Sequence, residues 1–285
     1  MPTYSTLATP SATRTVLEAH GLSTKKSLGQ HFLANDAIVG KILELADVQP
    51  GDRVLEVGPG IGTLTVALLA AGAQVVAIER DPNLPAVLEE TCAEWADQLT
   101  VLSMDALNVQ PGQLPFAPTK FIANLPYAVA ATLVLDYFER FDSLEQATVM
   151  VQSEVADRMQ AKPGTKDYGA YTVKLSLYAQ AAGRFKVGPG NFFPPPRVDS
   201  AVIRLNRSGS ELSPEERAAA ATMAEAAFAS RRKTLANSCK TYFANQPEIL
   251  KALSAIFEAA GIDPATRGET LTTTDFITLA KSLLK

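Results

Sequence analysis

The sequence predicts an α/β fold: a seven-stranded, mostly parallel Rossmann-like sheet with an antiparallel edge, followed by a small all-helical domain. Short apolar or β-branched runs alternate with helix-like segments up to residue 205, which is typical of a parallel sheet covered on both faces. Beyond that residue the pattern is helical only. The expected strands are 54–57, 75–78, 99–102, 121–122, 148–152, 184–187 and 201–205.

A helix is expected before the sheet begins. Asp36 can cap a helix that runs to Leu45, because an Asp side chain accepts hydrogen bonds from the free N–H groups of a first turn. Residues 38, 39, 42 and 43 are apolar and lie on one stripe of that helix. The segment is therefore expected to be an N-terminal helical extension of the sheet domain.

The proline-rich stretch 189–196 separates the last two expected strands. Proline lacks a backbone N–H and breaks helices, so this stretch cannot form a crossover helix. The strands on either side are therefore expected to form a hairpin-like antiparallel edge.

A polar, glycine-containing segment at 206–210 is typical of a linker. We place the domain boundary near residue 208. Residues 1–208 are then the sheet domain with its N-terminal extension, and residues 209–285 are a helical domain.

Three helices are expected in the second domain. Residues 213–216, Ser-Pro-Glu-Glu, form a capping box with proline at the first helical position, which predicts a helix to about Ala229. A second helix runs over 247–260 and ends at Gly261, and a third begins near Thr274.

Composition excludes several classes of protein. A chain of 285 residues that is 47% hydrophobic is globular rather than disordered. Cys92, Cys239, His20 and His31 fit no disulfide framework or metal-binding spacing, so we expect no metal. The start of the chain lacks a secretory pattern, and the longest apolar stretch, 64–78, is interrupted and too short to cross a bilayer. We expect a cytoplasmic protein without a membrane partner.

The net charge of -4 does not by itself favour a nucleic-acid partner. Local basic clusters nevertheless exist, and each taken singly is more typical of a solvated face than of a binding site. Placement of several clusters around one cleft would reverse that interpretation. The cationic residues concerned are Lys25, Lys26, Arg158, Lys162, Lys166, Arg231, Arg232, Lys233 and Lys240.

A glycine-rich turn, Glu-Val-Gly-Pro-Gly-Ile-Gly at 56–62, follows the first strand and leads into a helix that starts near Thr63. Gly58 and Gly60 let a small ligand approach the backbone closely, as in other doubly wound folds. The G-x-G-x-x-G/A fingerprint of dinucleotide binding is not matched, because its sixth position is Thr63.

Acidic residues follow the next two strands. Glu79 can accept hydrogen bonds from both hydroxyls of a ribose, which suits NAD and S-adenosylmethionine alike, and Asp105 can accept from an adenine amino group. Helix capping or turn formation is the alternative for each residue alone. Their position at successive strand ends favours ligand binding.

The sequence Asn124-Leu125-Pro126-Tyr127 follows the fourth strand, at the sheet edge where open α/β folds bind ligands. The residue before a proline is extended, so the Leu125 carbonyl is expected to turn outward beside the Asn124 side-chain oxygen. Two acceptors would then converge on one planar amine, and Tyr127 could stack on the attached base. An ordinary β-turn is the alternative for an isolated match.

Taken in order, these strand-end motifs are similar to those of S-adenosylmethionine-dependent methyltransferases that act on amino groups. The chain resembles more closely the small-subunit ribosomal RNA adenine N6,N6-dimethyltransferase family of the KsgA type, from about Thr13 to the C-terminus. One departure is His31, where bacterial members commonly carry Asn. The further segments that carry the resemblance are 26–33, 158–169, 192–200 and 228–235.

The resemblance implies S-adenosylmethionine as cofactor and assigns residues to it. His31 and Leu33 would help to cover the cofactor, Glu79 would hold the ribose hydroxyls, and Asp105 would bind the adenine amine. The remaining cofactor residues that the resemblance implies are Gly58, Gly60 and Asn124.

The same resemblance implies dimethylation of two adjacent adenines in a loop of 16S-type ribosomal RNA, and a role in small-subunit biogenesis. Asn124 and Leu125 would align the adenine N6 with the methyl group, and the flipped base would stack between Tyr127 and Phe192. Pro126 fixes the turn. A catalytic histidine is not required, since a sulfonium methyl is already electrophilic.

We expect the RNA to be held by the helical domain, with Arg231, Arg232 and Lys233 on its first helix as phosphate contacts. The expected partner is small-subunit RNA within a pre-small-subunit ribosomal particle, and the expected state is a monomer.

Three alternatives remain open. An enzyme of the same architecture that acts on large-subunit RNA would share the cofactor motifs, and a non-catalytic RNA-binding assembly factor would share the scaffold. An NAD oxidoreductase is disfavoured by Thr63 in the glycine turn and by the lack of a hydride-transfer acid.

Overall fold

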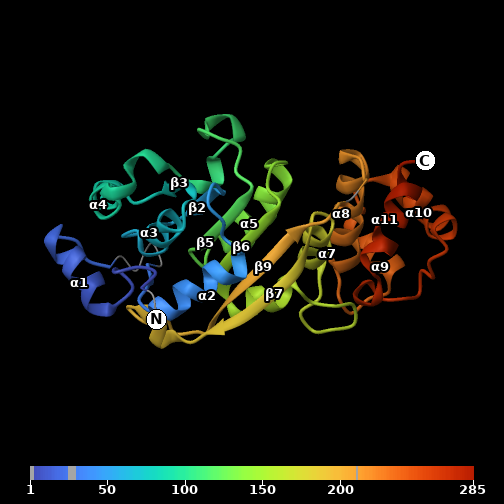
Figure 1. The fold of residues 1–285 in the computed structure, drawn as a ribbon. Helices are drawn as coiled ribbons and strands as arrows, with labels where there is room; N and C mark the ends of the chain where they lie inside the picture. The colour runs from blue at the N-terminus through green and yellow to red at the C-terminus, as the bar shows by residue number, and fades with distance from the viewer. Residues whose placement is uncertain (1–2, 25–29, 210) are drawn as a thin grey trace. The chain divides into compact units, whose positions relative to one another are not determined.

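The computed structural model describes residues 3–24, 30–209 and 211–285, and Figure 1 shows its elements. The chain divides into two compact units. The first comprises Met1–Ala156 and Ala181–Arg207, and the second comprises Asp157–Gln180 and Ser208–Lys285. The boundary expected near residue 208 agrees with this division, but residues 157–180 differ from the expectation. They belong with the helical unit and not with the sheet.

The first unit is built on a seven-stranded sheet, which confirms the predicted fold. All seven expected runs form strands; β9 is antiparallel to β6, while the pairs from β4 to β6 are parallel. In spatial order the strands are β4 (Leu99–Ser103), β3 (Gln74–Glu79), β2 (Arg53–Val57), β5 (Lys120–Asn124), β6 (Gln146–Gln152), β9 (Ser200–Arg207) and β7 (Ala179–Val187).

The strand order creates a binding crevice between β2 and β5. From β2 the chain builds outward through β3 to β4, and then returns to place β5 on the other side of β2. Ligands of open α/β sheets bind beyond the carboxyl ends of the strands at such a reversal. The glycine turn after β2 and the Asn-Leu-Pro-Tyr turn after β5 therefore lie at the same edge.

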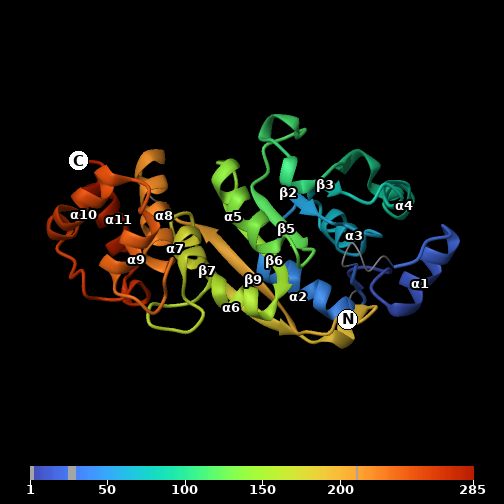
Figure 2. The same ribbon diagram turned by 180° about the vertical axis from the view of Figure 1, so that it is seen from behind.

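Helices cover both faces of this sheet (Figure 2). Alternate residues of a strand point to opposite faces, and β5 shows both environments. Ile122 belongs to the apolar cluster of α2 and α3, whereas the Phe121 ring lies 4.9 Å from that of Tyr137 on α5. The helices that begin in this unit are α1 (Pro10–Ala19), α2 (Asp36–Ala46), α3 (Thr63–Ala70), α4 (Pro85–Thr91), α5 (Ala130–Arg140) and α6 (Ser153–Met159).

The start of α2 differs from the prediction in one detail. Asn35 is the N-cap, and its side chain accepts from Ala37 N at 3.0 Å. Asp36 is the first helical residue, and its carboxylate accepts from the backbone N–H groups of Tyr4 and Ser5. The Asp36 side chain therefore ties the N-terminal segment to α2 instead of capping the helix.

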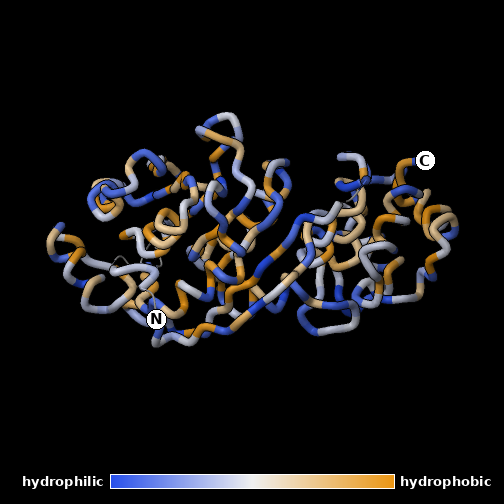
Figure 3. The backbone as a smooth tube through the Cα atoms, viewed as in Figure 1, coloured by the Kyte–Doolittle hydropathy of each residue, from blue (hydrophilic) through white to orange (hydrophobic). Residues whose placement is uncertain are grey.

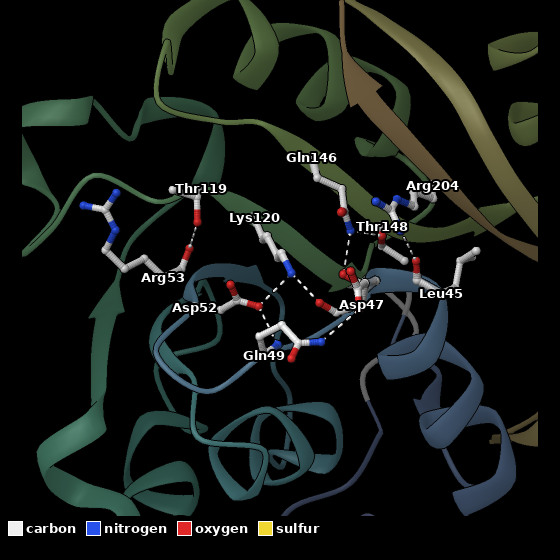
Figure 4. A network of polar contacts seen from close by, with 11 residues as sticks. Leu45, Asp47, Gln49, Asp52, Arg53, Thr119, Lys120, Gln146, Thr148 and Arg204 are labelled. Atoms are coloured by element: carbon white, nitrogen blue, oxygen red, sulfur yellow. Dashed lines mark hydrogen bonds and ion pairs between the residues drawn. The ribbon is translucent and has the colours of Figure 1, made fainter.

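The amino edge of the sheet is closed by the polar network in Figure 4. Lys120 donates to the Asp52 carboxylate at 2.7 Å and to the Asp47 carbonyl at 2.6 Å, and Gln146 donates to the Ala46 carbonyl at 2.9 Å. These polar groups satisfy one another's hydrogen-bonding capacity at the start of β2, β5 and β6. Their role is therefore structural.

A second, two-stranded sheet was not expected. β1 (Phe32–Leu33) pairs antiparallel with β8 (Phe192–Phe193), and Leu33 lies opposite Phe192. This pairing joins the segment before α2 to the proline-rich stretch.

The second unit is helical, as predicted. Both hydrogen bonds of the Ser213 capping box are present, and α10 ends at Gly261, whose φ of 65° is left-handed. Sequence reasoning missed α9. The helices are α7 (Ala170–Ser176), α8 (Pro214–Phe228), α9 (Leu235–Tyr242), α10 (Pro247–Ala260) and α11 (Thr273–Leu283).

Tyr168 explains why 157–180 joins the helical unit. Its hydroxyl donates to the Leu271 carbonyl at 2.7 Å, and its ring lies 5.8 Å from that of Phe228. Val173 is buried in the same cluster. By contrast, the loop between α6 and α7 is hydrophilic (Figure 3).

Candidate active site

A cavity of about 420 Å³ lies at the carboxyl edge of the sheet, within the first unit. It collects side chains and backbone from five separate parts of the sequence. Every residue predicted for the cofactor lines it, together with the whole turn after β5. These residues are His31, Leu33, Gly58, Gly60, Glu79, Asp105, Asn124, Leu125, Pro126 and Tyr127.

The glycine turn forms one wall of the cavity. Its backbone adopts left-handed conformations that residues with side chains rarely adopt. Gly58 has a φ of 68° and Gly60 a φ of 63°. A Cβ on Gly60 would lie 2.8 Å from the Phe32 ring. The turn therefore requires glycine at 60, and it leaves backbone exposed to a ligand.

Glu79 is buried at the end of β3, with 6% of its surface exposed. Its carboxylate accepts from Asp81 N at 2.8 Å and from Gly60 N at 3.3 Å. Burial raises its pKa, and these two backbone hydrogen bonds oppose that effect. Each carboxylate oxygen keeps a lone pair, so Glu79 can still accept from two hydroxyls.

Asp105 combines the two roles that the sequence left open. One oxygen caps the short 3-10 helix Ala106–Asn108 by accepting from Leu107 N at 3.0 Å. The other lies 3.5 Å from Arg80, whose side chain is 68% exposed. Exposed pairs of this kind are weak, so Asp105 remains available to a ligand amine.

Glu56 is a buried carboxyl on the cavity wall for which sequence reasoning gave no role. It is 1% exposed and accepts from the Thr65 hydroxyl at 2.8 Å. Burial raises the pKa of Glu56 to about 8, and the nearby charge of Glu79 adds to the effect. The only signal in the sequence was an acidic residue inside an apolar strand, which indicates a group that must be satisfied internally.

The Asn124 side chain is oriented by His31. Its Nδ2 donates to the His31 carbonyl at 3.1 Å. A carbonyl accepts only, so the amide nitrogen must face His31, and the amide oxygen is left as an acceptor. Leu125 N donates to the Met150 carbonyl at 3.1 Å, which extends the pairing between β5 and β6 into the turn.

Two contacts orient the Tyr127 ring. Its hydroxyl lies 2.6 Å from Ser200 Oγ, and Ser200 is fully buried at the start of β9. The His31 imidazole stacks on the ring, with centroids 5.9 Å apart and planes at 25°. Burial raises the Tyr127 pKa, so its hydroxyl stays protonated near neutral pH. Sequence reasoning missed Ser200, because the contact joins the turn after β5 to β9, which lies far along the chain.

Phe192 does not lie where the sequence placed it. It is 4% exposed, belongs to the same apolar cluster as Leu33, and does not line the cavity with Tyr127. The reason is the pairing of β8 with β1, which commits the Phe192 side chain to the core. The structure therefore does not bring Phe192 to the cavity beside Tyr127, and its role as the opposite aromatic wall stays a prediction.

The predicted position of the basic residues of the helical unit was wrong. Arg231, Arg232 and Lys233 lie in the turn between α8 and α9 and not on the first helix. Arg231 donates to the carbonyls of Lys166 and Tyr168 at 2.7 and 2.8 Å. This contact brings the turn against the loop that carries Lys166, so two of the basic clusters become one exposed surface.

Lys25 and Lys26 lie outside the described residues, as does the part of segment 26–33 before Gln30. In the described part of the chain, no group of three or more His, Cys, Asp or Glu side chains is placed to hold a metal ion. In that same part, no helix is both long and apolar enough to cross a membrane.

The family model described as ribosomal RNA adenine dimethylase matches residues 21–284. The protein belongs to this family. A ribosomal RNA small subunit methyltransferase A from Rhodococcus erythropolis is 41% identical over 278 residues, which cover 95% of this chain and 92% of that protein. The predicted resemblance is thereby confirmed.

Solved structures agree with this assignment. A dimethyladenosine transferase from Plasmodium falciparum superposes with a TM-score of 0.76 at 25% identity, covering 87% of this chain and 96% of the other. The 23S rRNA methyltransferase ErmE superposes with a TM-score of 0.65 at 27% identity. The match covers 89% of this chain and 100% of the ErmE chain. The fold is therefore shared by a protein named as a dimethyladenosine transferase and by one named as a 23S rRNA methyltransferase.

Proposed function

We propose that this adenine dimethylase family member transfers methyl groups from S-adenosylmethionine to N6 of two adjacent adenines in a loop of small-subunit ribosomal RNA, as part of small-subunit biogenesis. One observation carries the proposal: a single cavity holds the acidic and glycine residues suited to an adenosyl cofactor beside an Asn-Leu-Pro-Tyr turn suited to an amine. The family and the small-subunit name of the Rhodococcus relative support it.

The cavity fits the cofactor in chemistry as well as in place. The Gly60 backbone lies where a Cβ would collide with Phe32, and Glu79 keeps acceptor positions for a ribose. Asp105 accepts from the adenine amine, and His31, Leu33, Gly58 and Asn124 enclose the remainder. When bound, the sulfonium supplies an electrophilic methyl group.

The protein's own task is then to position the acceptor amine. The Asn124 amide oxygen and the Leu125 carbonyl accept the two N6 hydrogens, which directs the nitrogen lone pair away from both. As positive charge develops on the amine, these oxygens stabilise it. A monomethylated amine keeps one hydrogen and a lone pair, so a second transfer can use the same site.

Tyr127 supplies the aromatic surface for the flipped base. Stacking on a protein ring offsets part of the cost of taking a base out of its stack. The bond from its hydroxyl to Ser200 fixes the plane of the ring before substrate arrives.

The exposed surface formed by Lys162, Lys166, Arg232 and Lys233 holds RNA phosphates, with Arg231 anchoring the turn to the loop. The partner is small-subunit RNA within a pre-small-subunit particle, and the protein acts as a cytoplasmic monomer. Overall acidity does not oppose this, because the cations are local.

Two rival functions make different predictions. An enzyme for large-subunit RNA, as ErmE is named, would share the cavity. A non-catalytic assembly factor would not need Glu79, Asp105 and Asn124 gathered in one cavity, so their arrangement favours an enzyme.

The test supplies purified protein and radiolabelled S-adenosylmethionine to small and large ribosomal subunits isolated from cells that lack this protein. We expect label in small-subunit RNA only, and mass spectrometry should place dimethyladenosine at two adjacent positions. Label in large-subunit RNA would favour the rival enzyme. Cofactor binding by calorimetry without transfer to either subunit would favour the assembly factor.

A further inference from the structure

His31 makes three contacts at the place proposed for the acceptor base. Its Nδ1 lies 2.8 Å from the Pro194 carbonyl, its own carbonyl accepts from Asn124, and its ring stacks on Tyr127. Since a carbonyl only accepts, Nδ1 carries the hydrogen. The imidazole is thus fixed at its edge while its face covers Tyr127.

The spacing of the two rings excludes a base between them. Nonbonded carbon atoms approach to about 3.5 Å, so a base inserted between two rings needs centroids about 7 Å apart. The His31 and Tyr127 centroids are 5.9 Å apart. The imidazole is itself a planar nitrogen heterocycle, and it lies in contact with the ring that a flipped adenine would use.

We propose that the His31 imidazole occupies the base-stacking face of Tyr127 until the target adenine displaces it, so that this side chain sets how readily the base enters. The inference rests on the proposed placement of the adenine at Asn124 and Tyr127. An aliphatic side chain at this position could not fill that role, because it lacks an aromatic face.

Displacement does not disturb the rest of the site. The contact with Asn124 uses the His31 main chain, and the pairing of β1 with β8 begins at the next residue. Rotation of the imidazole therefore frees Tyr127 while the Asn124 oxygen keeps its orientation. The cost is the ring contact and the hydrogen bond to Pro194.

The first experiment measures methyl transfer to small subunits, with cofactor affinity by calorimetry, for wild type, His31→Ala and His31→Phe. His31→Ala removes the competing ring, so KM for the subunit should fall by about two- to tenfold, the range of an aromatic pair. His31→Phe keeps a ring and should leave that KM at or above the wild-type value. Cofactor affinity should change by less than the KM in both variants.

The second experiment observes the ring directly. The chain has two histidines, so the His31 ring signals in a proton spectrum are assigned by their loss in His31→Ala. Stacking on Tyr127 shifts these signals upfield, and saturation with an RNA hairpin that carries the target loop should move them to unstacked positions. Melting temperatures verify that the variants are folded.

Distinct results overturn the two proposals. An unchanged KM in His31→Ala, or ring signals that do not move with RNA, would mean that the base uses another surface. A loss of cofactor affinity with the KM unchanged would make His31 a cofactor cover only. Wild-type rates in Asn124→Ala would instead overturn the proposed function itself.

Discussion

The side-chain amide of Asn124 donates to the main-chain carbonyl of His31 across 3.1 Å. Because the donor belongs to a side chain and the acceptor to the backbone, substitution of His31 leaves the contact intact, whereas substitution of Asn124 abolishes it. The orientation of the acceptor oxygen therefore depends on the His31 main chain and not on the His31 side chain.

Asn124→Ala should lower kcat for methyl transfer by about 100-fold, since preorganised polar groups at a developing charge contribute on that scale. The protein should stay folded, because the Leu125 backbone still pairs with Met150. Single-turnover rates with bound cofactor measure the effect. A fall in cofactor affinity that accounts for the whole loss would assign Asn124 to the cofactor only.

Ser200→Ala should lower kcat by about fivefold to tenfold through Tyr127, as expected when one net hydrogen bond is removed. Tyr127→Phe removes the same bond and keeps the ring, so the double variant should be little worse than either single one. Transfer rates of the four proteins complete the cycle. Fully additive losses would show that Ser200 does not act through Tyr127.

Phe192→Leu should lower the free energy of unfolding by about 1 kcal/mol or more, because it removes volume from a packed core. Its transfer rate should stay within about twofold of wild type. Urea unfolding and initial rates measure the two quantities. A large loss of rate without a loss of stability would restore Phe192 as a stacking wall.

Glu56 should make stability fall as pH rises. Its pKa is raised by burial from 4.5 to about 8, so the folded state holds a proton that the unfolded state has released between these values. The stabilising contribution is present below 4.5 and disappears as pH rises through 8, with a slope of up to about 1.4 kcal/mol per pH unit. Urea unfolding from pH 5 to pH 8.5 should show a flatter profile for Glu56→Gln. Equal slopes in both proteins would refute a protonated Glu56.

Arg232→Ala and Lys166→Ala should each weaken RNA binding and reduce the salt dependence of log K by about one unit for each phosphate that is no longer neutralised. Lys251→Ala is the matched control, because Lys251 is exposed in the same unit and its ion pair is with the nearby Glu248. Arg231→Ala should also lower the melting temperature, since it holds the Lys166 and Tyr168 carbonyls. Equal losses of RNA affinity in Lys251→Ala and Arg232→Ala would show that this surface does not bind RNA specifically.

The local pattern predicted most of the fold. Strand alternation located all seven strands, and Gly261 and the Ser213 capping box set helix ends correctly, because these signals depend on neighbours in sequence. The strands β1 and β8 were missed, since two residues each are too short for a period-two pattern and depend on a partner far along the chain.

The same distinction applies to the site. Glu79, Asp105 and Asn124 were found because each ends or closely follows a strand, and a parallel sheet brings such ends together. The stacking of His31 on Tyr127, the bond to Ser200 and the burial of Phe192 were not found. They depend on side-chain packing between segments that no spacing in the sequence relates.

The pairing of β1 with β8 also has a consequence for synthesis on the ribosome. β1 forms its sheet with residues that are translated about 160 positions later. Until that stretch leaves the exit tunnel, the strand beside His31 has no partner, and the cavity lacks the support of one wall. We therefore expect a nascent chain to gain cofactor affinity late, once β8 has paired with β1. This pairing can form before the helical unit is complete.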